Sequence, residues 1–477
     1  MASGKSEIQT IEMQEHQDQP AHNTGGPLMR SKEDDMGIWR TVLRHKRIGL
    51  IAMAAAFCAS LDGYQINLNG NIVANKGFIR QMANPGTTII AGKYVSAWGG
   101  IQSTGQAVGQ ILLQYATEGY GRKPALLIIW VVLTASIFTE SFASRWDHWL
   151  VAKLLSGMGV GMLQSTMPLY LSEITPSQIR ETPWWLVSKD RMDKARKSLE
   201  ICNGDVKDYD YDEQLEVMRA TVAAERQEAE INNELGQWSV FQGRNLIRFL
   251  IAGWPKIAQQ FVGLSVFNTY AAYFFQKAGS TNTFMVTIIL SCVQLISMLV
   301  TAVTTDRFGR RPLTVYPYGV TVVSVLCLGI IGCFNYSTKQ LSSLLIFFAC
   351  LATFSTTGAS AIGYAYATEI PQQRLRARTA AWSLAFSNMI SIMFSFCTPL
   401  MINGTAAWGV KTGFFFAGTG TIATIIAWFI LPEVTRRTPA EIDEMFNKHV
   451  PLRKFKGHVT EVQMRADQIH DKQDTAA

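Results

Sequence analysis

Polar side chains stand at helical intervals in one long apolar segment of the 477-residue chain. Gln259 and Gln260 open this segment, and Asn268 and Tyr270 follow on later turns of the same predicted helix. An amide within a membrane is costly unless a partner satisfies its hydrogen bonds. These side chains therefore predict either hydrogen bonds between packed helices or contacts to a ligand that carries hydroxyl groups.

Charged residues also fall inside apolar segments. Among them, Asp62 lies in the first of these segments and Lys153 lies in a later one. Charged groups within a membrane are expensive, and they often mark proton or ion pathways. Asp62 is therefore a candidate proton carrier, and a structural ion pair with Lys153 is the alternative.

Acidic and basic residues recur together at the ends of the apolar segments. The sequence EGYGRKP (118–124) is repeated as DRFGRRP (306–312), and SEITPSQIR (172–180) is repeated as TEIPQQRLR (368–376). Orientation in the membrane requires only the basic residues. Acidic partners at repeated positions instead favour a charged cytosolic gate between two halves of the protein. The predicted gate residues are Glu118, Arg122, Glu173, Arg180, Asp306, Arg310, Glu369, Arg374 and Arg376.

The elements that carry these residues are apolar spans. Charged residues are 17% of the chain and are concentrated in 1–47, 186–245 and 433–477. A soluble α/β enzyme is excluded, because apolar runs such as 125–138 and 284–305 do not suit a water-soluble surface. About twenty apolar residues cross a membrane, so we predict an all-α polytopic membrane protein with ten spans. They lie near 48–72, 92–115, 124–143, 149–172, 247–276, 283–304, 312–334, 341–368, 379–402 and 411–431.

Basic residues in the short loops orient the chain. One set of loops carries Arg122, Lys123, Arg307, Arg310, Arg311, Arg374, Arg376 and Arg378, and the opposite set carries Arg145, Lys277, Lys339 and Lys411. The richer set is placed in the cytosol. The net charge of +7 thus reflects loop asymmetry, and no nucleic-acid partner is expected.

The predicted organisation is a disordered cytosolic N-tail (1–47), an incomplete N-terminal transmembrane bundle (48–180), a cytosolic loop with short helices (181–245), a C-terminal transmembrane bundle (246–432) and a cytosolic C-tail (433–477).

The internal repeat reveals a gap in the first half. Two predicted spans separate Arg376 from Glu433, whereas Glu181 follows Arg180 directly. The first half therefore lacks two helices. Because the missing number is even, the orientation of the downstream spans is preserved. Two parallel repeats of this kind are typical of transporters that bind their substrate near the membrane midplane.

An ordered series of motifs resembles the sugar-porter branch of the major facilitator superfamily, and the fungal alpha-glucoside and hexose transporters in particular. The motifs are GYGRKP, DRFGRRP, PLYLSEITPSQIR, TPWWLVSKDRMDKA, QQFVGLSVFNTYAAYF, EIPQQRLRART and LPEVTRRTPAEIDEMF, within residues 45–455. The resemblance implies twelve spans, with the fifth and sixth between two motifs that are fused here at Arg180 and Glu181. A splice variant or a truncated gene model explains the fusion, and a natural ten-span transporter is the alternative.

The resemblance also implies roles for single residues. The positions that match the family's sugar-binding residues are Gln259, Gln260, Ser265, Asn268, Tyr270, Tyr364 and Asn388. Ser265 stands where the family pattern has Asn, and Thr269 replaces the first of two tyrosines. Because of these differences, the resemblance does not identify which sugar is bound. Gln65 stands where family symporters carry Asp, and Lys153 stands where they carry Arg. Gln cannot titrate, so either Asp62 carries the proton or the protein is a facilitator.

The predicted function is transport of a sugar, either an alpha-glucoside such as maltose or a hexose, by proton symport and alternating access. We expect a monomer in the lipid bilayer of the plasma membrane, with the vacuolar membrane as the alternative. A facilitative uniporter, a non-transporting sugar sensor and an inactive truncated product are the other functions considered. We expect no cofactor, no metal, no catalytic residue and no enzymatic activity, because the sequence has no nucleotide-binding loop, metal-ligand cluster or nucleophile arrangement. The missing helices predict weak or absent transport. They also predict that the polar faces of the remaining helices contact either lipid or a poorly closed cavity; these faces contain Gln65, Asn67, Asn69, Gln102, Gln106 and Gln110.

Overall fold

The computed structural model describes residues 63–65, 68, 72, 75–82, 90, 92–174, 183–203, 211–231, 238–263, 283–334, 339–372, 375–403, 408–435 and 437–464. All regular secondary structure in this part of the chain is helical, which confirms the predicted all-α fold. The α-helices are α5 (Lys76–Met82), α6 (Gly92–Tyr120), α7 (Arg122–Phe142), α8 (Trp146–Ile174), α9 (Pro183–Ser188), α10 (Met192–Asn203), α11 (Tyr211–Ile231), α12 (Gly243–Phe261), α14 (Thr283–Phe308), α15 (Pro312–Ile331), α16 (Lys339–Glu369), α17 (Arg376–Asn403), α18 (Thr412–Ile430) and α19 (Pro439–Asn447). Short 3-10 helices are η2 (Ser239–Phe241), η4 (Gly409–Lys411) and η5 (Leu452–Gly457).

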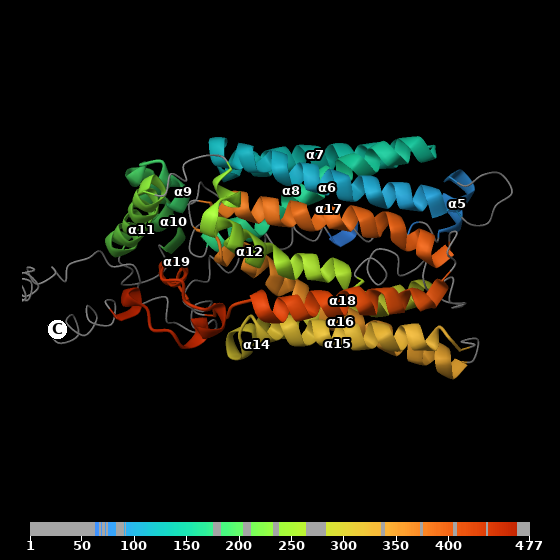
Figure 1. The fold of residues 1–477 in the computed structure, drawn as a ribbon. Helices are drawn as coiled ribbons and strands as arrows, with labels where there is room; N and C mark the ends of the chain where they lie inside the picture. Colours follow the sequence, from blue (N-terminus) through green and yellow to red (C-terminus); the bar gives the residue numbers. More distant parts are fainter. Residues whose placement is uncertain are drawn as a thin grey trace, which may run out of the picture.

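The long helices lie side by side along one direction (Figure 1). Helix α8 packs against α6 and α7, and in the second half of the chain α16 packs against α14 and α15. Helix α12 contacts α16, α17 and α18, and α17 also packs along α6. The contact between α6 and α17 joins the two halves of the chain.

Six of the described helices are long and apolar enough to cross a membrane. They correspond to the predicted spans 124–143, 283–304, 312–334, 341–368, 379–402 and 411–431. Helices α6 and α8 have 29 residues each and occupy the predicted spans 92–115 and 149–172. Helix α12 covers the first part of 247–276. The first predicted span, 48–72, lies almost wholly outside the described residues, so the count of ten stays a prediction.

Glycines allow α6 and α8 to approach closely. A Cβ atom added to Gly105 or Gly109 of α6 would overlap the backbone carbonyl oxygens of α8. A Cβ added to Gly157 or Gly161 of α8 would in turn overlap the carbonyl oxygens of α6. Both pairs have the spacing Gly-x-x-x-Gly, which places small residues on one face and lets helix backbones meet within a membrane.

A row of amides lies on α6 at intervals of four residues, which places these side chains on one helix face. Its members are Gln102, Gln106, Gln110 and Gln114, and none of them is more than 8% exposed. Gln65 is also buried. The described side chains of these polar faces are therefore not exposed to lipid, whereas Gln102 and Gln106 line a cavity. Asn67 and Asn69 lie outside the described residues.

The segment 437–464 packs against the start of α12. Arg248 of α12 pairs with Asp443 of α19, and its guanidinium lies 4.6 Å from the centroid of the Phe446 ring. Arg437 donates to Glu441 at 3.1 Å. Helix α19 lies at the same end of the bundle as α9, α10 and α11, and α5 lies at the opposite end (Figure 1). Part of the predicted C-tail is thus folded.

Candidate functional site

A cavity of about 270 Å³ lies where α6, α8, α12, α14, α16 and α17 meet. Its lining is rich in neutral hydrogen-bonding groups, and none of the described lining residues is Asp or Glu. The amides are Gln102, Gln106, Gln164, Gln259, Gln260, Gln294 and Asn388, and the hydroxyl groups belong to Ser103, Thr357, Ser360, Tyr364, Ser387, Ser391 and Ser395. Such a surface can exchange hydrogen bonds with a ligand that carries several hydroxyl groups.

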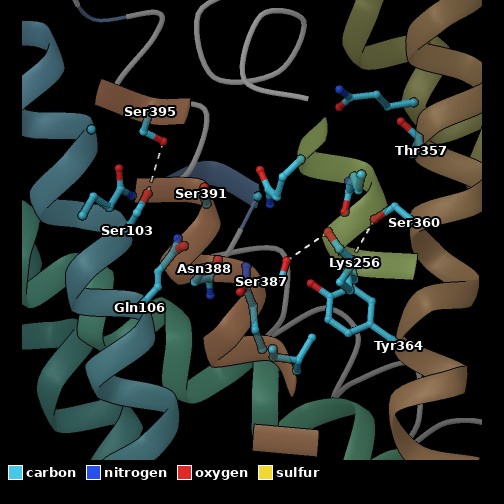
Figure 2. A pocket seen from close by; sticks show the side chains of 18 of the residues that line it. Ser103, Gln106, Lys256, Thr357, Ser360, Tyr364, Ser387, Asn388, Ser391 and Ser395 are labelled. Atoms are coloured by element: carbon cyan, nitrogen blue, oxygen red, sulfur yellow. Dashed lines mark hydrogen bonds between the residues drawn. The ribbon is translucent and has the colours of Figure 1, made fainter. Parts of the chain in front are cut away.

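Side chains from both halves of the chain enclose this cavity (Figure 2). Ser103 and Gln106 of α6 face it from one side, and Ser360 and Tyr364 of α16 face it from the other. A contact between Ser103 Oγ and Ser395 Oγ, 3.3 Å long, joins α6 to α17 beside the cavity. The lining is therefore assembled by the packing of the two halves and not by one helix alone.

Lys256 of α12 brings an ammonium group into this otherwise neutral lining. Its Nζ donates to Ser360 Oγ at 2.8 Å and lies 3.4 Å from the centroid of the Tyr364 ring. The residue is 7% exposed, and its backbone carbonyl accepts a hydrogen bond from Ser387 Oγ. Lys256 thus links α12, α16 and α17, and it holds the aromatic face of Tyr364 at the cavity wall.

Four of the residues expected to bind a sugar line the cavity: Gln259, Gln260, Tyr364 and Asn388. Gln259 and Gln260 are each 6% exposed. The Oε1 atom of Gln260 has no hydrogen-bond partner among the described residues. Asn388 Nδ2 donates to Gln110 Oε1 at 3.0 Å, so this amide also joins α17 to α6.

The other expected sugar-binding residues, Ser265, Asn268 and Tyr270, lie outside the described residues. Asp62, the candidate proton carrier, lies outside them as well. Gly63, the residue that follows it, lines the cavity.

Lys153 has a carboxylate partner that the sequence reasoning missed. Its Nζ lies 2.8 Å from Glu140 Oε1 of α7, and the Lys153 side chain is fully buried. Gln65 Nε2 donates to Glu140 Oε2 at 3.3 Å, and Ser156 Oγ donates to Gln65 Oε1 at 2.9 Å. The structure therefore brings Gln65 and Lys153 together, as the resemblance implies, around a carboxylate on a different helix.

The expected gate residues that the structure describes form a charge cluster at the ends of α14, α15 and α16. Arg310 Nε lies 2.6 Å from Glu369 Oε2. The backbone N–H groups of Arg310 and Arg311 donate to Glu433 at 3.0 Å and 3.1 Å. Arg376, at the start of α17, is buried. The structure does not describe the side chains of the other expected gate residues: Glu118, Arg122, Glu173, Arg180, Asp306 and Arg374.

Sequence signals existed for some of the residues that were missed. A lysine between Pro255 and Ile257 in an apolar span is an intramembrane charge, and this signal could have identified Lys256. Glu140 lies near the end of its apolar run, where a charge is common, so its sequence position carried no comparable signal. Among the described residues, no group of three or more His, Cys, Asp and Glu side chains could hold a metal ion.

Comparisons with known proteins agree with this geometry. A family model described as "Sugar (and other) transporter" matches residues 51–182 and 177–446. The general alpha-glucoside permease of Saccharomyces cerevisiae is 27% identical over 518 aligned positions, which cover 92% of this chain and 82% of the permease. Maltose permease MAL31 of the same yeast is 32% identical over 285 positions, which cover 58% of this chain and 45% of the permease.

Among solved structures, the proton:xylose symporter XylE of the major facilitator superfamily, bound to 6-bromo-6-deoxy-D-glucose, has a similar fold. It superposes with a TM-score of 0.68 and 17% sequence identity, over 84% of this chain and 100% of the XylE chain. At this sequence identity the likeness concerns the fold.

Proposed function

Because the chain belongs to the sugar (and other) transporter family, we propose that it is a membrane carrier that binds a sugar in the cavity between α6, α12, α16 and α17. The proposed substrate is an alpha-glucoside such as maltose, in line with the names of the yeast permeases that resemble the chain. A hexose is the second candidate substrate. Movement of the two halves relative to each other would expose the cavity to each side of the membrane in turn.

The observation that carries this proposal is the chemistry of the cavity wall. Amide and hydroxyl groups can both donate and accept hydrogen bonds, as the hydroxyl groups of a sugar also do. Gln260 Oε1 is a buried acceptor without a described partner, and a sugar hydroxyl would satisfy it. The ring of Tyr364 adds an apolar face against which a sugar ring can stack.

The proposed transport is coupled to protons. The polar cluster of Gln65, Lys153 and Glu140 holds an ion pair within the membrane-spanning part of the protein, and such groups often serve proton pathways. Facilitated transport without protons is the alternative. The proposed location is the plasma membrane, where a carrier of this kind would take up an external sugar.

We further propose that the first half of the chain lacks two helices at the junction of Arg180 and Glu181. Two observations support this gap. The internal repeat has two predicted spans in the second half without counterparts in the first, and the family model matches the chain in two pieces that overlap at residues 177–182. The proposed consequence is that the chain binds sugar but transports it slowly, because part of one helix bundle is absent.

Sugar binding by the purified chain tests the proposed function independently of transport. Isothermal titration with maltose and with glucose should give saturable binding of at least one of them. Replacing Gln106 of the cavity wall by Leu should weaken that binding by about tenfold, or about 1.4 kcal/mol, because a buried hydrogen-bonding group is lost. The matched control is Gln340→Leu, since Gln340 is an exposed amide at the start of α16.

Two results would contradict the proposal: no binding of either sugar by folded protein, or equal loss of binding in both leucine variants. Binding together with an absence of uptake, even after the missing helices are restored, would favour a sugar sensor over a carrier.

A further inference from the structure

Beside the cavity, one ion pair is enclosed within the first half of the chain. The carboxylate of Glu140 lies between Lys153, whose Nζ is 2.8 Å from Oε1, and Gln65, whose Nε2 is 3.3 Å from Oε2. The Lys153 side chain has no exposed area and the Glu140 side chain retains 9%. Glu140 thus supplies, from α7, the negative charge that Lys153 of α8 requires for burial.

Aromatic rings cover the lysine side of this pair. Lys153 Nζ lies 4.8 Å from the centroid of the Trp149 ring. Trp149 packs against Phe78 of α5 and Trp98 of α6, with ring centroids 4.9 Å and 6.5 Å away. The rings exclude water from the ammonium, and the Trp149 face gives it a second, uncharged partner. Lys153 would therefore keep one favourable contact if the Glu140 carboxylate became neutral.

The charged and titratable groups on the elements around the pair are few. Among the residues whose side chains the structure describes, they are Tyr64 beside Gln65, Arg80 on α5, Arg145 in the connection from α7, and the following residues of α6 and α8: Lys93, Tyr94, Tyr115, Tyr120, Asp147, His148 and Lys153. Lys153 is the member of this group that pairs with Glu140, whereas Asp147 lies 3.5 Å from Arg145 at the exposed start of α8. Protonation of Glu140 would therefore act mainly on its contact with Lys153.

A chain of two hydrogen bonds connects Glu140 to the cavity. Gln65 donates its side-chain N–H to Glu140, and the backbone carbonyl of Gln65 accepts from Gln102 Nε2 at 3.2 Å. Gln102 lines the cavity. A change in the charge of Glu140 can therefore shift Gln65, and with it the position of an amide in the cavity wall.

On the basis of the proposed sugar transport, we infer that Glu140 is the carboxylate that binds the transported proton, with Gln65 as the positioning residue between it and the cavity. A hydronium ion transfers a proton to a carboxylate oxygen of Glu140: one O–H bond of the hydronium breaks, an O–H bond to Glu140 forms, and a water molecule is left. The hydrogen bond from Lys153 to that oxygen breaks in the same step. After the carrier changes its orientation, the O–H bond of Glu140 breaks, a water molecule takes the proton as hydronium, and the ion pair with Lys153 forms again.

Infrared spectroscopy of the purified full chain tests the proton site without requiring transport. Between neutral pH and the lowest pH at which the purified protein stays folded, the wild type should gain the band of a buried protonated carboxyl group. Glu140→Gln should lack this band, and Asp147→Asn, which removes a more exposed carboxylate at the same end of the protein, should retain it. The inference is overturned if wild type and Glu140→Gln give the same spectra across this range, because Glu140 would then remain ionised.

The linkage between sugar and proton is measured by titration calorimetry in two buffers that differ in ionisation enthalpy. Proton uptake per bound sugar should fall from about one in the wild type to about zero in Glu140→Gln, while sugar binding persists. Normal proton uptake in Glu140→Gln and its loss in Asp62→Asn would assign the role to Asp62 and overturn the inference. If the wild type binds no sugar, the proposed function fails, and the infrared titration still decides whether Glu140 binds a proton.

Glu140→Gln fixes permanently the neutral state that protonation of Glu140 reaches only during transport, and this state can lower the stability of the folded protein. The double variant Glu140→Gln with Lys153→Met removes both charges and keeps comparable side-chain volumes, so it avoids an isolated buried charge. It should fold, bind sugar and show neither the infrared band nor the proton linkage. Retention of the proton linkage in this folded double variant would contradict the inference.

Discussion

The amides of the cavity wall cost free energy when they are buried without hydrogen-bond partners. Gln259 and Gln260 are almost fully buried on α12, where an unsatisfied amide is costly. Gln260 Oε1 has no hydrogen-bond partner among the described residues, so the proposed sugar would satisfy this atom and recover part of the cost. The same reasoning applies less strongly to Asn388, which already donates to Gln110.

We expect Gln259→Ala and Gln260→Ala each to weaken sugar binding by about 1–3 kcal/mol, the range for a lost buried hydrogen-bond set. The effect should be measured by calorimetry in a version of the protein with two restored helices and normal surface expression. Gln340→Ala is the control, because Gln340 is an exposed amide at the start of α16. Unchanged affinity in both glutamine variants would mean that these side chains only join helices.

At single residues, the sequence predicted polar groups but not their partners. Gln259, Gln260, Tyr364 and Asn388 were identified through the family resemblance, and the structure places them around one cavity. The partner of Lys153 could not be predicted, because Glu140 meets it only after α7 and α8 pack together. Pairing within a membrane depends on the rotation of each helix about its axis, and residue spacing alone does not fix that rotation between helices.

Helix packing in the first half depends on close contact between α6 and α8. Gly157 of α8 faces the backbone of Gln102, and Gly161 faces the backbone of Gln106, so both glutamines of the cavity wall are positioned by this contact. The sequence predicted both spans from their apolar residues. It did not reveal the interlocking glycines, since such a pattern becomes informative only when the two helices are known to be neighbours.

Gly157→Val should separate α6 from α8 and destabilise the protein by about 1–3 kcal/mol, the usual cost of overpacking a close contact. The melting temperature from a thermal scan of the detergent-purified protein measures this effect. Gly418→Val on α18 is the control, because a Cβ added there has no atom within 4 Å. Equal melting temperatures for the Gly157 variant and the wild type would show that the glycine contact does not determine the packing.

Acid should weaken the folded structure of the segment 437–464 through protonation of Glu444. Burial favours a higher pKa, but hydrogen bonds from Lys448 and from the backbone N–H groups of Glu461 and Val462 outweigh it, so the pKa of Glu444 is lowered. A lowered pKa means that its stabilising contribution is present above the ordinary glutamate range, near pH 4.3, and is lost as the pH falls through the lowered value.

Hydrogen exchange at the amides of Glu461 and Val462, corrected for intrinsic rates, should therefore remain slow at neutral pH and become faster in acid. Glu444→Gln should remove most of this dependence and show fast exchange already at neutral pH. Exchange in the wild type that stays equally slow on both sides of the transition would mean that the carboxylate does not hold the segment in place.

At the scale of the whole molecule, the predicted topology has ten spans with both ends in the cytosol. Six described helices meet the length and apolarity of a membrane span, and α6, α8 and α12 occupy three further predicted positions. Glycan mapping should find no modification of acceptor sites placed near Cys202 or in the C-terminal segment, because both are predicted to remain cytosolic. A glycan at either position would contradict the topology.

The organisation into two halves could be predicted because sequence motifs repeat, whereas the shape of the cavity could not. The cavity requires α6 to pack along α17 and α12 to pack between α16 and α17, and these contacts join residues far apart in the chain. The amides of α6 are buried in this packing, so their predicted exposure to lipid is not seen.

The central claim is that this chain is a sugar carrier with two helices missing from its first half. Its most direct test is the uptake of labelled maltose and glucose by cells that lack their own sugar transporters. The chain as it stands is compared with a version that carries two restored spans between Arg180 and Glu181, at equal surface abundance. We expect little uptake by the chain as it stands and clear, saturable uptake by the restored version. Equal uptake by the two would show that the ten-helix chain is already a complete carrier, and uptake by neither would contradict the assignment as a sugar carrier.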